Sequence, residues 1–128
     1  MLNLSWESSR QTMLHTMHLN AEPFRKIADG SKTIELRLYD ERRRQLRTGH
    51  TIEFLGESGS LLVLVTALHV FPDFAELYSE LDMTKCGYSA KQAISASPDD
   101  MLCFYSRAQQ RKWGVVGIEF RLLSVTRR

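Results

Sequence analysis

The sequence of 128 residues is long enough for one domain that buries a hydrophobic core without disulfide bonds or a structural metal. Its 43% hydrophobic and 25% charged residues are typical of a soluble globular protein, and no apolar run approaches the ~20 residues that a membrane-spanning helix needs. The formal net charge of +2 does not by itself predict a polyanionic partner, and the N-terminus lacks the pattern of a secretory signal, so we expect a cytoplasmic protein.

The N-terminal part predicts a strand followed by a helix. Residues 1–14 show no clear period and are interpreted as a lead-in to the domain. A short strand is expected over 15–19. Asn20 can cap the N-terminus of the next helix because its side-chain oxygen accepts an unpaired backbone N–H, and Gly30 suits the left-handed position that follows a helix.

Three strands are predicted in the middle of the chain. Residues 33–39 alternate polar and apolar side chains, so the apolar row can enter a core while the polar row remains available for chemistry. Residues 50–55 and 61–71 predict two further strands, and the second is rich in apolar and β-branched residues. A glycine- and serine-rich loop over 56–60 is expected between them.

The C-terminal part predicts two helices, an irregular region and a last strand. Asp73 marks the start of the first helix through a capping-box spacing. Residues 82–97 are expected to be mostly irregular, with a short helix at 89–95. A serine and a proline then introduce a helix over 98–112, with acidic residues at its start and basic residues at its end. Residues 115–123 predict the last strand, and 125–128 are interpreted as a C-terminal tail.

This order of elements predicts an α+β domain over residues 15–124. Because most strands follow one another without a long crossover, we expect a mixed, mostly antiparallel sheet. About five strands with helices at the openings favour a small curled β-barrel over a doubly wound sheet.

The strongest functional signal is the segment 30–37, which reads G-S-K-T-I-E-L-R. Lys32 lies where the predicted helix gives way to the strand, and Thr33, Glu35 and Arg37 share one face of that strand. One short segment therefore gathers an ammonium group, a hydroxyl, a carboxylate and a guanidinium group. Such a set can bind a polar ligand, hold a structural ion pair or carry out acid–base chemistry.

Segment 30–37 resembles the G-x-K-x-x-E-x-R signature of the ASCH domain family. Residues 17–20, 38–40 and 114–120 resemble a prokaryotic branch of the same family, so the resemblance spans about residues 15–123. It implies a β-barrel related to the PUA fold, a cleft beside the signature and a role in RNA binding. One fold hosts many functions, so the function must be argued from the site.

The first hypothesis is a module that binds single-stranded RNA or a nucleotide in that cleft. Cations would hold phosphates, a carboxylate would accept a hydrogen bond from a base, and aromatic rings would stack on bases. The residues expected to bind the ligand are Lys32, Glu35, Arg37, Tyr39, Arg42, Arg43 and Arg44. Further stacking candidates are Tyr105 and Trp113, and further basic groups lie at 107–112 and 127–128. For each residue the alternative is an ordinary packing or ion-pair role.

The second hypothesis is a small hydrolase that acts on a modified nucleoside or on RNA. One branch of the resembled superfamily hydrolyses N4-acetylcytidine with a lysine, a threonine and a distant glutamate. Lys32 matches the lysine, but Glu35 stands where that branch has the threonine. The catalytic candidates in this reading are Lys32, Thr33 and Glu35, and the distant glutamate could be Glu53 or Glu76.

No metal or cofactor is expected. The histidines are scattered, and those at 15 and 18 fall on opposite faces of the predicted strand. Cys86 and Cys103 lack a C-x-x-C spacing and are interpreted as reduced thiols, with Cys103 buried in a helix. The sequence does not predict the oligomeric state.

Overall fold

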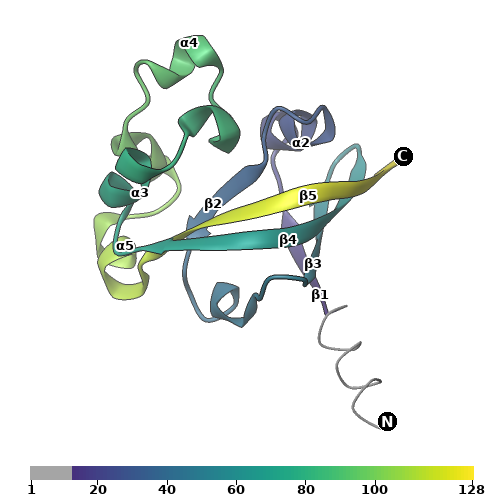
Figure 1. Ribbon diagram of the computed structural model, residues 1–128, viewed down its shortest axis with the longest axis horizontal. Coiled ribbons are helices and arrows are strands. Elements are labelled where there is room, and N and C mark those ends of the chain that lie inside the picture. The colour runs from purple at the N-terminus through teal and green to yellow at the C-terminus, as the bar shows by residue number, and fades with distance from the viewer. Residues whose placement is uncertain (1–12) are drawn as a thin grey trace, which may run out of the picture.

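The computed structural model describes residues 13–128 and contains one mixed sheet of five strands (Figure 1). The strands are β1 (Leu14–His18), β2 (Ile34–Leu38), β3 (Thr51–Gly56), β4 (Gly59–Phe71) and β5 (Val115–Arg127). Their order in the sheet is β1-β3-β4-β5-β2, and only the β1–β3 pair is parallel. The predicted α+β class and the mostly antiparallel sheet are confirmed.

Helices after β4 gather at one end of the sheet, whereas α2 lies at the other side of β2 (Figure 1). The α-helices are α2 (Ala21–Ala28), α3 (Phe74–Glu80), α4 (Ala90–Ala93) and α5 (Arg107–Trp113). The 3-10 helices are η1 (Arg43–Gln45), η2 (Met83–Cys86) and η3 (Pro98–Cys103). Within residues 13–128, no helix is both long enough and apolar enough to cross a bilayer.

The predicted barrel is wrong in one respect, because backbone hydrogen bonds do not close it. Among the described residues, β1 and β2 are the two edges of the sheet. Side chains instead join these edges: Arg37 donates from Nη2 to the carbonyl oxygen of His18 at 2.7 Å, and Arg42 donates from Nη2 to that of Thr16 at 3.1 Å. The free carbonyls of an edge strand need such partners or water. We call these two contacts the seam.

Two hydrophobic cores lie on opposite faces of the curled sheet. The core inside the curl is formed mainly by Met17, Phe24, Ile27, Leu46, Ile52, Phe54, Val63, Val65, Ile118 and Phe120. The second core packs the helices against the outer face and includes Ile34, Leu36, Leu38, Phe74, Leu77 and Met101. The alternation predicted for 33–39 is therefore confirmed, since its apolar row enters the second core and its polar row points the other way.

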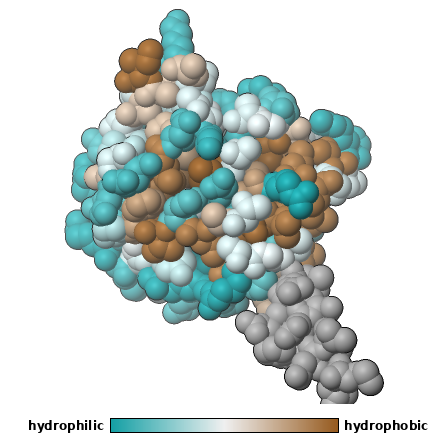
Figure 2. All heavy atoms as spheres, viewed as in Figure 1, coloured by the Kyte–Doolittle hydropathy of each residue, from teal (hydrophilic) through white to brown (hydrophobic). Residues whose placement is uncertain are grey.

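The face of the molecule over β4 and β5 carries both hydrophobic and hydrophilic side chains. Figure 2 shows hydrophobic side chains along β4 and β5 in the middle of this face, separated by hydrophilic ones. Val70 on β4 and Leu123 on β5 are exposed.

Several local signals behave as predicted. Gly30 has a positive φ of 87° directly after α2, as expected for a glycine that ends a helix. The carboxylate of Asp73 accepts a hydrogen bond from the backbone N–H of Glu76 at 2.9 Å and caps α3. The predicted role of Asn20 is wrong in one respect: it stands at the N-cap of α2, but its side chain makes no capping hydrogen bond.

Three element boundaries differ from prediction. The helix expected over 98–112 is two elements, because Ser106 starts α5 with its own capping box. As a result Cys103 ends η3 and is exposed, not buried. The loop expected at 56–60 is a tight turn, since Gly56 and Gly59 are already paired. Finally, β5 continues to Arg127, so most of the residues predicted as a tail extend the sheet. Residues 1–12 of the predicted lead-in lie outside the described residues.

Candidate nucleotide pocket

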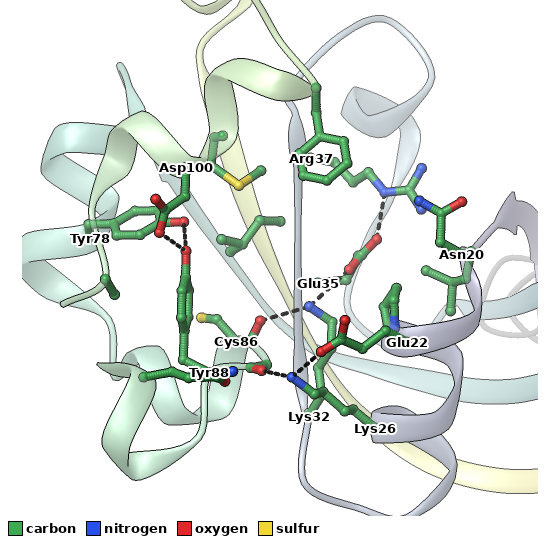
Figure 3. A pocket seen from close by; sticks show the side chains of 18 of the residues that line it. Asn20, Glu22, Lys26, Lys32, Glu35, Arg37, Tyr78, Cys86, Tyr88 and Asp100 are labelled. Carbon is green, nitrogen blue, oxygen red and sulfur yellow. Dashed lines mark hydrogen bonds and ion pairs between the residues drawn. The ribbon is translucent and has the colours of Figure 1, made fainter. Parts of the chain in front are cut away.

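A pocket of about 670 Å³ opens beside segment 30–37. One wall consists of the polar row of β2 and one side of α2, and the opposite wall comes from α3 and the chain between η2 and α5 (Figure 3). This volume lies in the range of small-molecule sites, which is about 300–1,000 Å³. The resemblance implied a cleft at this place.

Lys32, Glu35 and Arg37 form a largely buried charged row in the wall that β2 and α2 provide. The Glu35 carboxylate bridges two cations: Oε1 lies 3.1 Å from Nζ of Lys32, and Oε2 lies 2.8 Å from Nε of Arg37. The three side chains are only 8, 9 and 13% exposed for Lys32, Glu35 and Arg37, respectively. Burial alone would raise the pKa of Glu35, but the charges and hydrogen bonds of the two cations outweigh it and hold this pKa below its usual range. Glu35 is therefore an anion at neutral pH.

Two lysines tie the walls of the pocket together. Lys32 donates from Nζ to the carbonyl oxygen of Cys86 at 2.8 Å, and Lys26 of α2 donates to the carbonyl oxygen of Gly87. Figure 3 shows both ammonium groups directed at this turn. The turn follows η2, and Gly87 has a φ of +108°, where a side chain would be strained. The last carbonyls of a helical turn lack partners within it, so cations are favourable there.

The second wall is aromatic and carries one carboxylate. The hydroxyl of Tyr88 donates to Oδ2 of Asp100 at 2.8 Å and lies 2.7 Å from the hydroxyl of Tyr78, which must then donate to Tyr88. Burial raises the pKa of both tyrosines, so both remain neutral phenols. Phe104 lies at the pocket with 60% of its surface exposed. Its ring is 6.4 Å from that of Tyr105, which also lines the pocket.

Three of the seven predicted ligand-binding residues line this pocket, as does Tyr105, one of the two further stacking candidates. Lys32, Glu35 and Arg37 are brought together as described. Tyr39 lies outside it, with the Arg44 guanidinium 4.4 Å from the centre of its ring. Thr33 is also outside the lining, and its backbone N–H and C=O pair with neighbouring chain segments.

Arginines of the turn 42–47 bind protein groups outside the pocket. Arg42 belongs to the seam. Arg43 pairs with Asp40 at 3.0 Å, and Arg44 donates to the carbonyl oxygen of Trp113 at 2.8 Å. Arg47 donates to the carbonyl oxygens of Arg44 and Leu46. These residues hold the turn and its neighbours in place.

The other chemical candidates find little support in the geometry. Glu53 and Glu76, the candidates for a distant catalytic glutamate, are not part of the lining. Cys86 lines the pocket, but burial raises the pKa of its thiol to about 11, which leaves little thiolate at neutral pH. Over residues 13–128, no three histidine, cysteine or acidic side chains are grouped as a metal site would require.

Sequence reasoning missed most of the second wall. Tyr88, Asp100 and Phe104 lie in a region without periodicity, so their convergence on the β2 row had no local signature. One signal was available. Asp100 stands three residues after Ser97 and completes a capping box with it, which fixes the carboxylate near the start of η3.

Comparison with known proteins gives a consistent family likeness. The model of the ASCH domain family matches residues 17–124. The crystal structure of hypothetical protein PH0355 is 32% identical with a TM-score of 0.74, covering 87% of this chain and 100% of that one. The solution NMR structure of protein PF0455 from Pyrococcus furiosus is 35% identical with a TM-score of 0.65, covering 88% of this chain and 99% of that one.

A more distant likeness concerns the fold alone. The crystal structure of a mutant of ZmASCH from Zymomonas mobilis has a TM-score of 0.61 at 15% identity, covering 91% of this chain and 75% of that one. A comparison with curated proteins gave no match.

Proposed function

Because the chain belongs to the ASCH domain family, whose PUA-like fold is associated with RNA binding, we propose that its pocket binds one unpaired base of a single-stranded RNA or the base of a free nucleotide. The observation that carries this proposal is the arrangement of the two walls. A buried row of charges faces exposed and half-buried aromatic rings across a pocket of about 670 Å³. Bases of single-stranded RNA are commonly bound by this combination of polar groups and stacking surfaces.

The charges of the pocket balance one another, which favours a neutral ring over a phosphate. Its ionic lining residues are three cations and three carboxylates: Lys26, Lys32 and Arg37 against Glu22, Glu35 and Asp100. Each cation is already paired, since Lys26 lies 3.0 Å from Glu22 and the other two bind Glu35. A phosphate entering here would displace such a pair, whereas a base can use the hydrogen-bonding capacity that remains.

The remaining donors and acceptors lie on opposite sides of the pocket. On the β2 side, Arg37 uses Nε and Nη2 on protein groups, which leaves Nη1 for a ligand oxygen or ring nitrogen. On the other side, Asp100 binds Tyr88 and the Ser97 N–H through Oδ2, which leaves Oδ1 to accept from a base N–H. In our proposal these two residues orient the base while Phe104 stacks on its face.

Binding accounts for the site better than hydrolysis does. Lys32 uses its ammonium group to hold Glu35 and the Cys86 carbonyl oxygen, which is a structural task. Both oxygens of Glu35 accept from cations, and Thr33, the hydroxyl named as a catalytic candidate, is outside the lining. The proposal therefore gives the charged row a role in shaping the pocket.

The test compares two exposed apolar residues that both lie in the chain between η2 and α5. Phe104→Ala removes the proposed stacking surface, whereas Ile94→Ala changes a residue that is 88% exposed and outside the pocket lining. Loss of base stacking costs about 1–3 kcal/mol, so we expect Phe104→Ala to weaken binding of a short single-stranded RNA about 5- to 150-fold. Fluorescence anisotropy with labelled RNA measures this, and Ile94→Ala should bind like the unmodified protein.

A calorimetric titration with free nucleosides completes the experiment. Heat of binding that is lost in Phe104→Ala supports seating of the base in the pocket. Equal RNA affinity for both variants would contradict the proposal. Appearance of a nucleoside product by mass spectrometry would favour the hydrolase alternative.

A further inference from the structure

The balanced charges of the pocket leave the phosphates of a bound RNA without an obvious contact. The arginines of the turn 42–47, which the sequence offered for this task, bind backbone carbonyls and Asp40. Phosphate contacts normally supply much of the affinity of a protein for nucleic acid. Cations without a close ionic partner lie near the pocket, on the other side of α2.

A second, smaller hollow lies there, with a volume of about 390 Å³. It is bounded by α2, the turn between β3 and β4, and the end of β5. Two guanidinium groups from different elements line it, Arg25 of α2 and Arg127 of β5. Arg127 makes no ion pair among residues 13–128, and Arg25 has only a distant one, 4.0 Å to Asp29 with 67% of its side chain exposed.

Asp29 is the one acidic residue among the described residues that line this hollow, and its Oδ2 makes only the 4.0 Å contact with Arg25. Its Oδ1 accepts the backbone N–H of Ser31 at 2.9 Å. Hydrogen bonding from the Ser31 side chain, and then from this backbone N–H, lowers the pKa of Asp29. The ionic lining is therefore two cations against one anion, unlike the balanced pocket. The excess positive charge is available to an anionic group.

Helix α2 separates the two hollows. Glu22 and Lys26 face the pocket, whereas Ala21, Arg25 and Ala28 face the second hollow, as residues spaced by three or four positions share one side of a helix. A helix with its side chains is about 10–12 Å across, so the two sites are about one helix width apart. Figure 1 shows the same order, with α2 between the α4 region and the C-terminal end of β5.

We propose that the hollow lined by Arg25 and Arg127 is a phosphate subsite for the RNA whose base occupies the pocket. The sugar–phosphate chain leaves the pocket, passes over α2 and places phosphate oxygens against the two guanidinium groups. Guanidinium forks suit such oxygens because they offer paired N–H donors. This inference rests on the proposed function and adds to it the course of the RNA chain over α2. Only ligands longer than one nucleotide reach the subsite.

The test uses a double variant and a control of equal charge. Arg25→Gln with Arg127→Gln removes both cations of the hollow. Arg111→Gln with Arg121→Gln removes two exposed arginines that lie outside both hollows. RNA affinity is measured by anisotropy over a series of salt concentrations, and nucleoside affinity is measured by calorimetry.

The subsite predicts a selective loss. Each phosphate contact to a single strand contributes about 0.7 to the slope of log affinity against log salt, so the Arg25/Arg127 variant should lose about 1.4 from this slope. Its affinity for a nucleoside should not change, and the Arg111/Arg121 control should keep the original slope.

Three results would overturn the subsite. An unchanged slope in the Arg25/Arg127 variant would do so while leaving the base pocket intact, since nucleoside binding would persist. An equal fall in both variants would show a diffuse effect of charge. Absence of both RNA and nucleoside binding in the unmodified protein would remove the proposed function together with the subsite.

Discussion

The charged row at 32–37 and the arginine-rich turn at 42–47 are neighbours in sequence, but their cations have different partners. In the row, two cations converge on the single buried carboxylate of Glu35 at 3.1 and 2.8 Å. In the turn, the guanidinium groups spread outward to backbone carbonyls and to Asp40. The row shapes a pocket, and the turn binds the edge strand β1 of the curled sheet through Arg42. The density of positive charge in the sequence is therefore a poor guide to binding; what the cations can reach decides their role.

The largest difference between the two groups should appear when their carboxylates are neutralised. Glu35→Gln leaves two buried cations without a counter-charge, so we expect the free energy of unfolding to fall by about 3–5 kcal/mol. Asp40→Asn acts on one cation instead of two, in a pair that is 15 and 27% exposed, and should cost less, about 1.5–3 kcal/mol for one charge-assisted hydrogen bond. Urea denaturation of both variants measures this contrast, and equal losses would contradict the assignment of different roles.

The same carboxylate predicts a pH dependence. Because the folded state lowers the pKa of Glu35, its stabilisation is fully present above the ordinary glutamate value of about 4.3 and is lost as pH falls through the lower folded value. The unmodified protein should lose stability in this acid range more steeply than Glu35→Gln does. Parallel stability curves for the two proteins would show that this pKa is not lowered.

An intermediate effect is expected from replacing arginine by lysine in each group. Arg37 donates from two different nitrogens, to Glu35 and to the His18 carbonyl oxygen, and a lysine ammonium cannot span both acceptors. Arg37→Lys should therefore lose one charge-assisted hydrogen bond, about 1.5–3 kcal/mol. Arg42 makes a single exposed bond, so Arg42→Lys should change stability by about 0.5 kcal/mol or less. Thermal and urea unfolding of the two variants test whether Arg37 contributes more than Arg42 to the stability of the seam.

The smallest effect concerns a pair of histidines, one on β1 and one directly before β3. His15 stacks on His50 with ring centroids 5.1 Å apart, and their Nε2 and Nδ1 atoms are 2.9 Å apart. Burial, with the nearby charges of His50 and Arg42, lowers the pKa of His15. The stabilisation is present above the ordinary value of about 6.5 and is lost as pH falls through the lower folded value. Melting temperatures between about pH 7.5 and 5 should fall less for His15→Gln than for the unmodified protein.

Sequence reasoning succeeded where the information was local. The segment 30–37 carried its own helix end, strand alternation and charge set, and the structure places three of its charged groups in one pocket wall. The Asp73 cap likewise follows from neighbouring residues.

It failed where distant segments meet. The seam depends on where the carbonyls of β1 come to lie beside β2, which no local pattern encodes. Helix 98–112 was predicted as continuous because the strong start at Ser97 outweighed the second capping box at Ser106, and this error also misplaced Cys103. Tyr105 was named as a stacking candidate and does line the pocket, but Phe104 was missed for the same reason, since it lies between the two caps in a segment without periodicity.

A chemical-shift titration of the ¹⁵N-labelled protein with a short single-stranded RNA tests the central claim most directly. If the pocket seats a base, the backbone amides of 32–37, 86–88 and 101–105 should shift, and those of 42–47 should stay in place. Binding that shifts the amides of 42–47 while leaving 32–37 and 101–105 unchanged would contradict the account, because it would assign recognition to the arginine turn.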